Sequence, residues 1–266
     1  MFCAVRSVVR RVEQLARGRQ TTDLVVLLYH EVPDESKQAF AAQIDRVLKK
    51  GRVVDLACRP LRLQPGINVA ITFDDALSSS FRNGVEELLR RGLPVLVFVP
   101  TGFLGRPPGW IRHSQHPAVS DPVLSSDELR HYSRRGVCFG SHTVSHPHLS
   151  RVRDDQLMRE LVDSRKELES VLGGTVDMLA FPYGDYDERV LTRARRAGYR
   201  AVFGSIPERS AMSLDGFLLA RVSVCMSDPV SGFDLKIRGG YGWQGAAVRL
   251  KRHLQGLRHP RRAAQA

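Results

Sequence analysis

The sequence predicts an α/β fold, a single distorted (β/α) barrel of about seven parallel strands. Short apolar runs alternate with stretches of helical periodicity along the 266 residues, a pattern typical of a parallel sheet. About seven or eight such units fit a closed or nearly closed barrel better than an open sheet. Polar clusters follow several apolar runs, and barrel active sites assemble at the carboxyl ends of strands.

The strands are expected where apolar residues run without a break or alternate with small ones. In chain order, we expect strands over residues 23–30, 52–56, 69–73, 94–99, 137–140, 178–181, 200–204 and 219–224.

The helices are expected where apolar residues recur every three or four positions. They are predicted over residues 37–50, 80–91, 126–135, 154–172 and 186–197. Gly51 is expected just after the end of the first of them, and Ser126 as the N-cap of the third. Residues 103–125 show no period and are predicted to form a long loop.

Two basic tails flank the predicted barrel domain at 23–245. Residues 1–22 form a basic amphipathic segment with five arginines against one glutamate, and residues 246–266 carry six basic residues and no acid. Together they hold most of the net charge of +12. The body between them does not interleave aromatic and basic residues, so we expect no nucleic-acid partner.

The C-terminal tail has a helical stripe at Ala247, Leu250, Leu254 and Leu257 among its basic residues. Such a helix can lie on an anionic bilayer, or it can pack on the barrel with a solvated basic face. No apolar run approaches the roughly 20 residues of a membrane span, and no signal peptide is recognisable. We therefore expect a cytoplasmic protein, with peripheral contact at the inner face of the membrane through its basic tails.

The four cysteines form no CxxC pair, so neither a zinc ribbon nor a redox motif is indicated. We expect no disulfide. Cys138 and Cys225 stand in apolar runs and are predicted to be small buried hydrophobic residues.

Two carboxylates and two imidazoles carry the chemistry. Asp74 and Asp75 end a predicted strand, and His142 and His146 stand four residues apart, with Pro147 favouring a turn at the second histidine. Separately, these residues are more often turn or surface residues than ligands. Together, two imidazoles and one carboxylate suit a catalytic divalent ion with open positions, zinc first and other divalent ions next.

Three motifs carry a resemblance to a known family. The segments TFDD at 72–75, HTVSH at 142–146 and FPYG at 181–184 resemble the first three motifs of polysaccharide deacetylases, the NodB-type domain of carbohydrate esterase family 4. The likeness runs from about residue 24 to about residue 224. It implies Asp74 as general base, a metal held by Asp75, His142 and His146, and the Tyr183 backbone N–H as an oxyanion donor.

Two positions depart from the family pattern. Ala180 stands where the third motif usually opens with an arginine that orients the base; Arg221 is a candidate replacement, with an ordinary charged strand-end residue as the alternative. The family's Leu-x-His motif is absent after residue 224, but Leu28-Tyr29-His30 occurs near the start, as in a permuted subgroup resembling poly-N-acetylglucosamine deacetylases. His30 is therefore the expected acid, with a turn-capping histidine as the alternative.

These observations predict a metal-dependent deacetylase that removes N-acetyl groups from an amino-sugar glycan or glycolipid, a metal-activated water attacking with Asp74 as base and His30 as acid. An O-acetyl esterase or a small-amide hydrolase would use the same residues, and a noncatalytic glycan-binding relative is the alternative of another class. Pro182, Trp110 and Tyr186 are the expected substrate contacts, although isolated aromatic residues are often packing residues.

Overall fold

The computed structural model describes residues 22–57, 60–111, 116–205 and 216–239. The expected N-terminal segment, apart from Thr22, and the C-terminal tail helix lie outside these ranges. So do Cys3 and Cys58.

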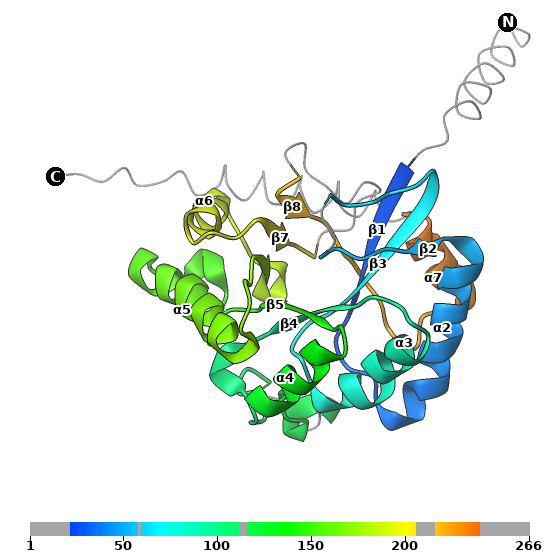
Figure 1. Cartoon of the computed structure of the whole chain (residues 1–266), viewed down its shortest axis with the longest axis horizontal. Coiled ribbons are helices and arrows are strands. Elements are labelled where there is room, and N and C mark those ends of the chain that lie inside the picture. Colours follow the sequence, from blue (N-terminus) through cyan, green and yellow to red (C-terminus); the bar gives the residue numbers. More distant parts are fainter. Residues whose placement is uncertain (1–21, 58–59, 112–115, 206–215, 240–266) are drawn as a thin grey trace, which may run out of the picture.

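A parallel sheet forms the centre of the molecule, as the alternating pattern predicted (Figure 1). The order of the strands is β8-β7-β6-β5-β4-β3-β1-β9, with β2 paired to β3, and every pair is parallel. The described ranges hold nine strands rather than about seven, because the sheet includes strands of only two residues that count as separate elements. They are β1 (Thr22–Tyr29), β2 (Arg52–Val53), β3 (Gly66–Phe73), β4 (Leu96–Val99), β5 (Cys138–Ser141), β6 (Met178–Ala180), β7 (Ala201–Phe203), β8 (Leu218–Leu219) and β9 (Val222–Ser223).

The two outermost strands of the sheet are consecutive in the chain. β8 pairs with β7 through Leu219, and β9 pairs with β1 through Val222. The single strand expected over 219–224 is therefore two short strands, separated by Ala220 and Arg221. This one segment joins both ends of the curved sheet and gives the barrel-like closure.

Helices cover the outer face of the sheet (Figure 1). Those that the periodicity predicted are present, whereas α7 was not predicted. The helices are α2 (Lys37–Lys50), α3 (Glu86–Arg90), which continues a π-helical turn at Ser80–Val85, α4 (Ser126–Arg134), α5 (Asp154–Leu172), α6 (Glu188–Arg196) and α7 (Val230–Ile237). Short 3-10 turns occur at Asp34–Ser36, Thr101–Phe103, Pro117–Ser120, Leu149–Arg151 and Pro182–Gly184.

Two local predictions were wrong in detail, the N-cap of α4 and the burial of the cysteines. The N-cap of α4 is Ser125, one residue earlier than expected, because only Ser125 has a glutamate three residues later to complete a capping box with Glu128. Gly51 directly follows the last residue of α2, as expected; its backbone is extended, and a Cβ there would lie 2.7 Å from the Ile67 carbonyl oxygen. Cys225 is exposed, because the chain turns outward after β9; Cys138 is half-buried, and both thiols are free.

The core has two layers because both faces of the strands are covered. On β1, Leu24 and Val26 point into the barrel, while Val25 and Leu27 pack under the helices. This double burial explains the unbroken apolar run.

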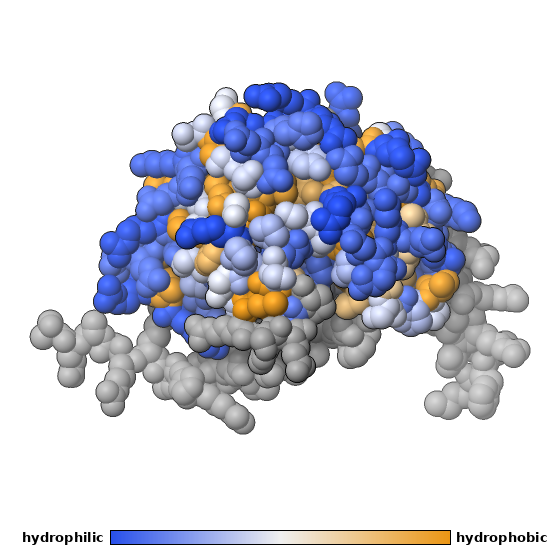
Figure 2. Space-filling model, turned by 90° about the horizontal axis from the view of Figure 1, so that it is seen from below, coloured by the Kyte–Doolittle hydropathy of each residue, from blue (hydrophilic) through white to orange (hydrophobic). Residues whose placement is uncertain are grey.

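Because β1 begins at the upper edge of Figure 1 and runs downward, Figure 2 faces the carboxyl ends of the strands. That face is largely hydrophilic, with apolar side chains in separate small patches. Within the described ranges, none of the helices combines the length and the hydropathy that crossing a bilayer requires.

Candidate active site and metal centre

The two acids lie where β3 ends, as the sequence predicted. The Asp74 N–H donates to the Tyr29 carbonyl at 2.9 Å and continues the β1–β3 ladder by one residue. The backbone then turns sharply, with φ of 68° at Asp75 and 49° at Ala76, both in the left-handed region. Such strain in non-glycine residues clusters at functional sites. Both carboxylates are buried, with 3% and 6% of their surface exposed.

The two histidines follow β5 in a turn of similar strain. The His142 N–H donates to the Val99 carbonyl at 2.9 Å, and Thr143 and His146 have φ of 70° and 57°. The turn expected at His146 is therefore present. Glu160 of α5, which sequence reasoning missed, accepts the N–H groups of Val144 and Ser145 at 2.8 and 2.9 Å. A charged residue inside the apolar stripe of α5 was the signal that could have revealed it.

The side chains of Asp75, His142 and His146 converge on one point. Their candidate ligand atoms all lie within 4.8 Å of one another. The Asp75 Oδ1 is 3.4 Å from the His146 Nε2 and 3.6 Å from the His142 Nε2. Among the described residues, this buried oxygen has no hydrogen-bond partner. One carboxylate oxygen and two imidazole nitrogens are ligand atoms that a divalent ion binds. Because this buried oxygen receives no hydrogen bond and faces both nitrogens, the three residues fit a metal.

The His142 ring is held in place by its other nitrogen. Its Nδ1 lies 2.9 Å from the Ala180 carbonyl oxygen. A carbonyl can only accept, so Nδ1 carries the proton and Nε2 presents its lone pair toward Asp75. Ala180, where an arginine was expected, thus contributes through its backbone.

Burial and charge set the protonation states. Burial lowers the pKa of His142 to about 4, which favours the neutral, ligating form. Burial alone would raise the pKa of Asp75, but the imidazoles of His146 and His142 outweigh it and lower that pKa to about 2. Both effects keep the cluster ready for a cation.

Arg221 lies against the expected general base. Its Nη1 and Nη2 donate to the two Asp74 oxygens at 2.7 and 2.8 Å, and its Nε donates to the Gly204 carbonyl at 3.1 Å. The guanidinium is fully buried. Burial raises the pKa of Asp74, but the charges of Arg221 and His142 outweigh it and hold that pKa below its usual value. This arrangement keeps Asp74 ionised.

His30 and Tyr183 reach the same end of the sheet. Tyr29 pairs with Phe73 across β1 and β3, so His30 and Asp74 leave neighbouring strands at the same level. The charge of His30 also contributes to lowering the pKa of Asp74 and Asp75. Tyr183 has a φ of 58° and is 53% exposed, and its ring stacks on that of His148 with centroids 4.1 Å apart.

The three expected substrate contacts, Trp110, Tyr186 and Pro182, have different surroundings. The Trp110 ring stacks on His146 with centroids 4.4 Å apart and meets Phe103 edge-on. The Tyr186 ring packs on Phe181 with centroids 5.1 Å apart, and Pro182 is buried. Their roles toward a sugar stay predictions, while the exposed Tyr183 ring is an aromatic surface that sequence reasoning did not single out.

Comparison with known proteins defines the class. The family model of the polysaccharide deacetylases matches residues 63–202, so the chain belongs to the polysaccharide deacetylase family. It is 26% identical over 164 residues to YxkH of Bacillus subtilis strain 168, covering 62% of this chain and 53% of that protein. It is 28% identical over 138 residues to a peptidoglycan-N-acetylglucosamine deacetylase of Bacillus cereus, covering 52% and 56%. The chain spans about half the length of these curated relatives.

Solved structures share the fold. IcaB from Ammonifex degensii superposes with a TM-score of 0.67 at 26% identity, covering 83% of this chain and 98% of that one. The deacetylase PplD of Streptococcus pyogenes has a TM-score of 0.63 at 20% identity, covering 81% and 98%. The expected barrel-like α/β fold is thus confirmed.

Proposed function

We propose that this protein is a metal-dependent hydrolase that removes N-acetyl groups from an amino-sugar glycan or glycolipid. The observation that carries the proposal is the convergence of Asp75, His142 and His146 beside an ionised Asp74. The name of the Bacillus cereus relative, which specifies N-acetylglucosamine, supports the substrate class.

The side chains divide the reaction between them. A divalent ion held by Asp75, His142 and His146, zinc or another, would supply Lewis-acid polarisation. Asp74 accepts a proton from the attacking water, and Arg221 keeps Asp74 ionised and oriented. The Tyr183 backbone N–H donates to the developing oxyanion. His30 protonates the leaving amine as the carbon–nitrogen bond breaks, so acetate and a free amine result.

Acetate release from an N-acetylglucosamine tetramer tests this function. Chelation should abolish release, and one equivalent of Zn²⁺ should restore it. Asp74→Asn should retain metal and lose turnover, whereas the double variant His142→Ala/His146→Ala should lose the metal. Full metal occupancy of the double variant by elemental analysis, or undiminished release by the chelated protein, would contradict the proposal.

A further inference from the structure

The two candidate metal-binding histidines differ in how their rings are held. The His142 Nδ1 lies 2.9 Å from the Ala180 carbonyl oxygen. Among the described residues, the buried His146 Nδ1 has no hydrogen-bond partner. A histidine that binds a metal normally donates its second ring N–H, and this bond fixes the direction of the ligating lone pair. His146 therefore needs another contact to orient its ring.

The contact that covers His146 is aromatic. The Trp110 ring stacks on the imidazole with centroids 4.4 Å apart and planes only 19° from parallel. Tyr183 meets the same imidazole at 75°, with centroids 4.7 Å apart. An indole lying flat on one face blocks rotation of the imidazole about its Cβ–Cγ bond. Trp110 thus restricts the ring in the way that the missing hydrogen bond would.

Trp110 is itself held in a defined position. Phe103 meets its ring edge-on, with centroids 4.9 Å apart and planes at 76°. The tryptophan lies in a turn in which the Ile111 N–H donates to the Pro108 carbonyl at 3.2 Å. Gly109 in this turn is so close to Phe103 that a Cβ would lie 2.6 Å from the ring. This close approach fixes the turn, and with it the indole, against Phe103.

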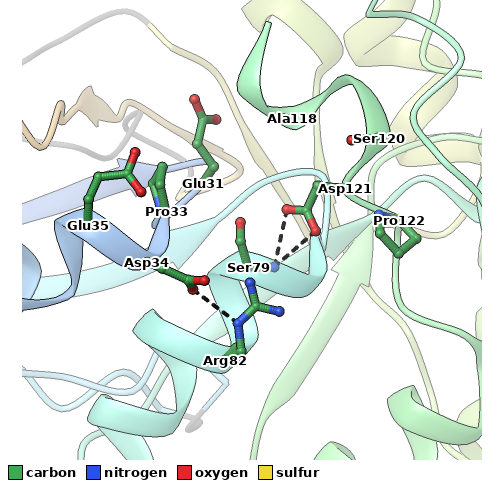
Figure 3. Close-up of a pocket in the computed structure, with 10 residues that line it drawn as sticks. All are labelled: Glu31, Pro33, Asp34, Glu35, Ser79, Arg82, Ala118, Ser120, Asp121 and Pro122. Carbon is green, nitrogen blue, oxygen red and sulfur yellow. Dashed lines mark hydrogen bonds and ion pairs between the residues drawn. The ribbon is translucent and has the colours of Figure 1, made fainter.

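The loop that carries Trp110 is attached to the segment that follows β3. Asp121 accepts the Ser79 backbone N–H with both carboxylate oxygens, at 3.2 Å each (Figure 3). The Leu124 N–H donates to the Ala76 carbonyl at 3.0 Å, and Ala76 directly follows the candidate metal-binding aspartate. The indole and that carboxylate are therefore held on one connected framework.

We propose that Trp110 is a positioning residue of the metal centre, which holds His146 by stacking in place of a hydrogen bond to Nδ1. This inference rests on the proposed metal site. An imidazole that shares its lone pair with a divalent ion becomes electron-poor, and the electron-rich indole face then attracts it more strongly. Because the stacking is stronger in the metal-bound state, Trp110 raises the affinity for the ion as well as orienting the ring.

A substrate contact is the alternative role for Trp110. The half-buried indole already presents one face to His146 and meets Phe103 edge-on, so at most one face remains for a sugar ring. Tyr183, which is 53% exposed, offers the larger free surface. The two roles differ in what the loss of the indole changes, since a positioning residue alters metal affinity and a substrate contact alters KM.

The Zn²⁺ affinity of the full chain, measured by competition with a chromogenic chelator, tests the proposal. Trp110→Leu should weaken Zn²⁺ binding by about tenfold. Trp110→Phe, which keeps an aromatic face, should recover most of this loss. The visible absorption of the Co²⁺-loaded chain reports the geometry of the ligands. It should change in Trp110→Leu and return toward the wild-type spectrum in Trp110→Phe.

The matched control is Tyr132→Leu. Tyr132 on α4 is also half-buried, and its ring packs on Phe81 with centroids 4.6 Å apart rather than on a candidate metal ligand. Its substitution removes a comparable aromatic contact and should leave both the Zn²⁺ affinity and the Co²⁺ spectrum unchanged. Phe103→Leu removes the edge contact to the indole and should give a smaller loss of Zn²⁺ affinity, which decides the question if Trp110→Leu fails to fold.

Equal Zn²⁺ affinity and equal Co²⁺ spectra in the wild type and Trp110→Leu would overturn the positioning role. An equal loss of affinity in Tyr132→Leu would also overturn it, because the effect would then follow from destabilisation alone. At saturating Zn²⁺, Trp110→Leu should have a lower kcat on the N-acetylglucosamine tetramer and a KM close to that of the wild type. A raised KM with unchanged Zn²⁺ affinity would assign Trp110 to the substrate instead. A wild type that binds no metal would count against the proposed function itself, whereas the other outcomes concern Trp110 alone.

Discussion

At the level of single residues, the pairing of Arg221 with Asp74 has the clearest consequence. The arginine lowers the pKa of a buried carboxylate, so its removal should raise that pKa and leave the base protonated at higher pH. Arg221→Met should therefore shift the acidic limb of the kcat/KM profile to higher pH and lower activity at neutral pH by about a hundredfold. It should also destabilise the fold by about 3–5 kcal/mol, because a buried charge loses its partner.

The control for this experiment is Arg221→Lys, which keeps the charge but not the two parallel hydrogen bonds. Compared with Arg221→Met, it should return the acidic limb of the kcat/KM profile most of the way to the wild-type pH. Its activity at neutral pH should recover less. A folded Arg221→Met variant whose acidic limb matches the wild type would show that Arg221 does not tune Asp74.

His30 is the residue whose role depends on the leaving group. An amine must be protonated as it departs, whereas an aryl oxide leaves as a stable anion. His30→Ala should lower N-deacetylation by about a hundredfold and spare much of the activity on an aryl acetate. Metal content should not change. Equal losses on both substrates, or loss of folding, would make His30 a structural residue that supports its turn.

At the level of elements, the sequence predicted most strands and helices because their apolar residues recur with a clear period. The α5 helix, Asp154–Leu172, has the bounds that periodicity predicted. By contrast, α7 has only eight residues and includes Gly232, and its buried residues Phe233 and Ile237 give too short a pattern to recognise. Short elements depend on what they pack against, which the local sequence does not contain.

The contact between α5 and the histidine turn gives a prediction at this level. Glu160 is buried and accepts the N–H groups of Val144 and Ser145. Glu160→Ala leaves both donors without a partner, so the free energy of unfolding should fall by about 2–4 kcal/mol. Because His146 follows these residues directly, Zn²⁺ affinity should fall as well.

Urea denaturation and competition with a chromogenic chelator measure the two effects of Glu160→Ala. Glu167→Ala on the exposed side of the same helix is the matched control and should change stability by less than about 0.5 kcal/mol. Unchanged Zn²⁺ affinity in a destabilised variant would show that the turn held by Glu160 does not position the metal ligands.

At the level of the whole molecule, motifs that are contiguous in the sequence predicted the acids and histidines, and parallel strands bring them together at one edge. Other parts of the site depend on contacts between distant segments. Arg221 reaches Asp74 only because β8 and β9 join opposite ends of the sheet. The long loop returns to the segment that follows β3, where Leu77 pairs with Val123. No local pattern contains either closure.

The distribution of charge predicts how the whole chain meets a membrane. Residues 246–266 contribute six basic residues to a net charge of +12 and lie outside the described barrel. Each basic residue near an anionic bilayer contributes about 1 kcal/mol, and salt screens the attraction. Deleting this tail should therefore weaken co-sedimentation with phosphatidylserine vesicles by more than about tenfold. Zn²⁺ content should stay unchanged, because the metal-site residues lie elsewhere. Phosphatidylcholine vesicles are the control and should bind neither form. If the truncated and full chains partition equally, the tail is better explained as a helix packed on the barrel with its basic face in solvent.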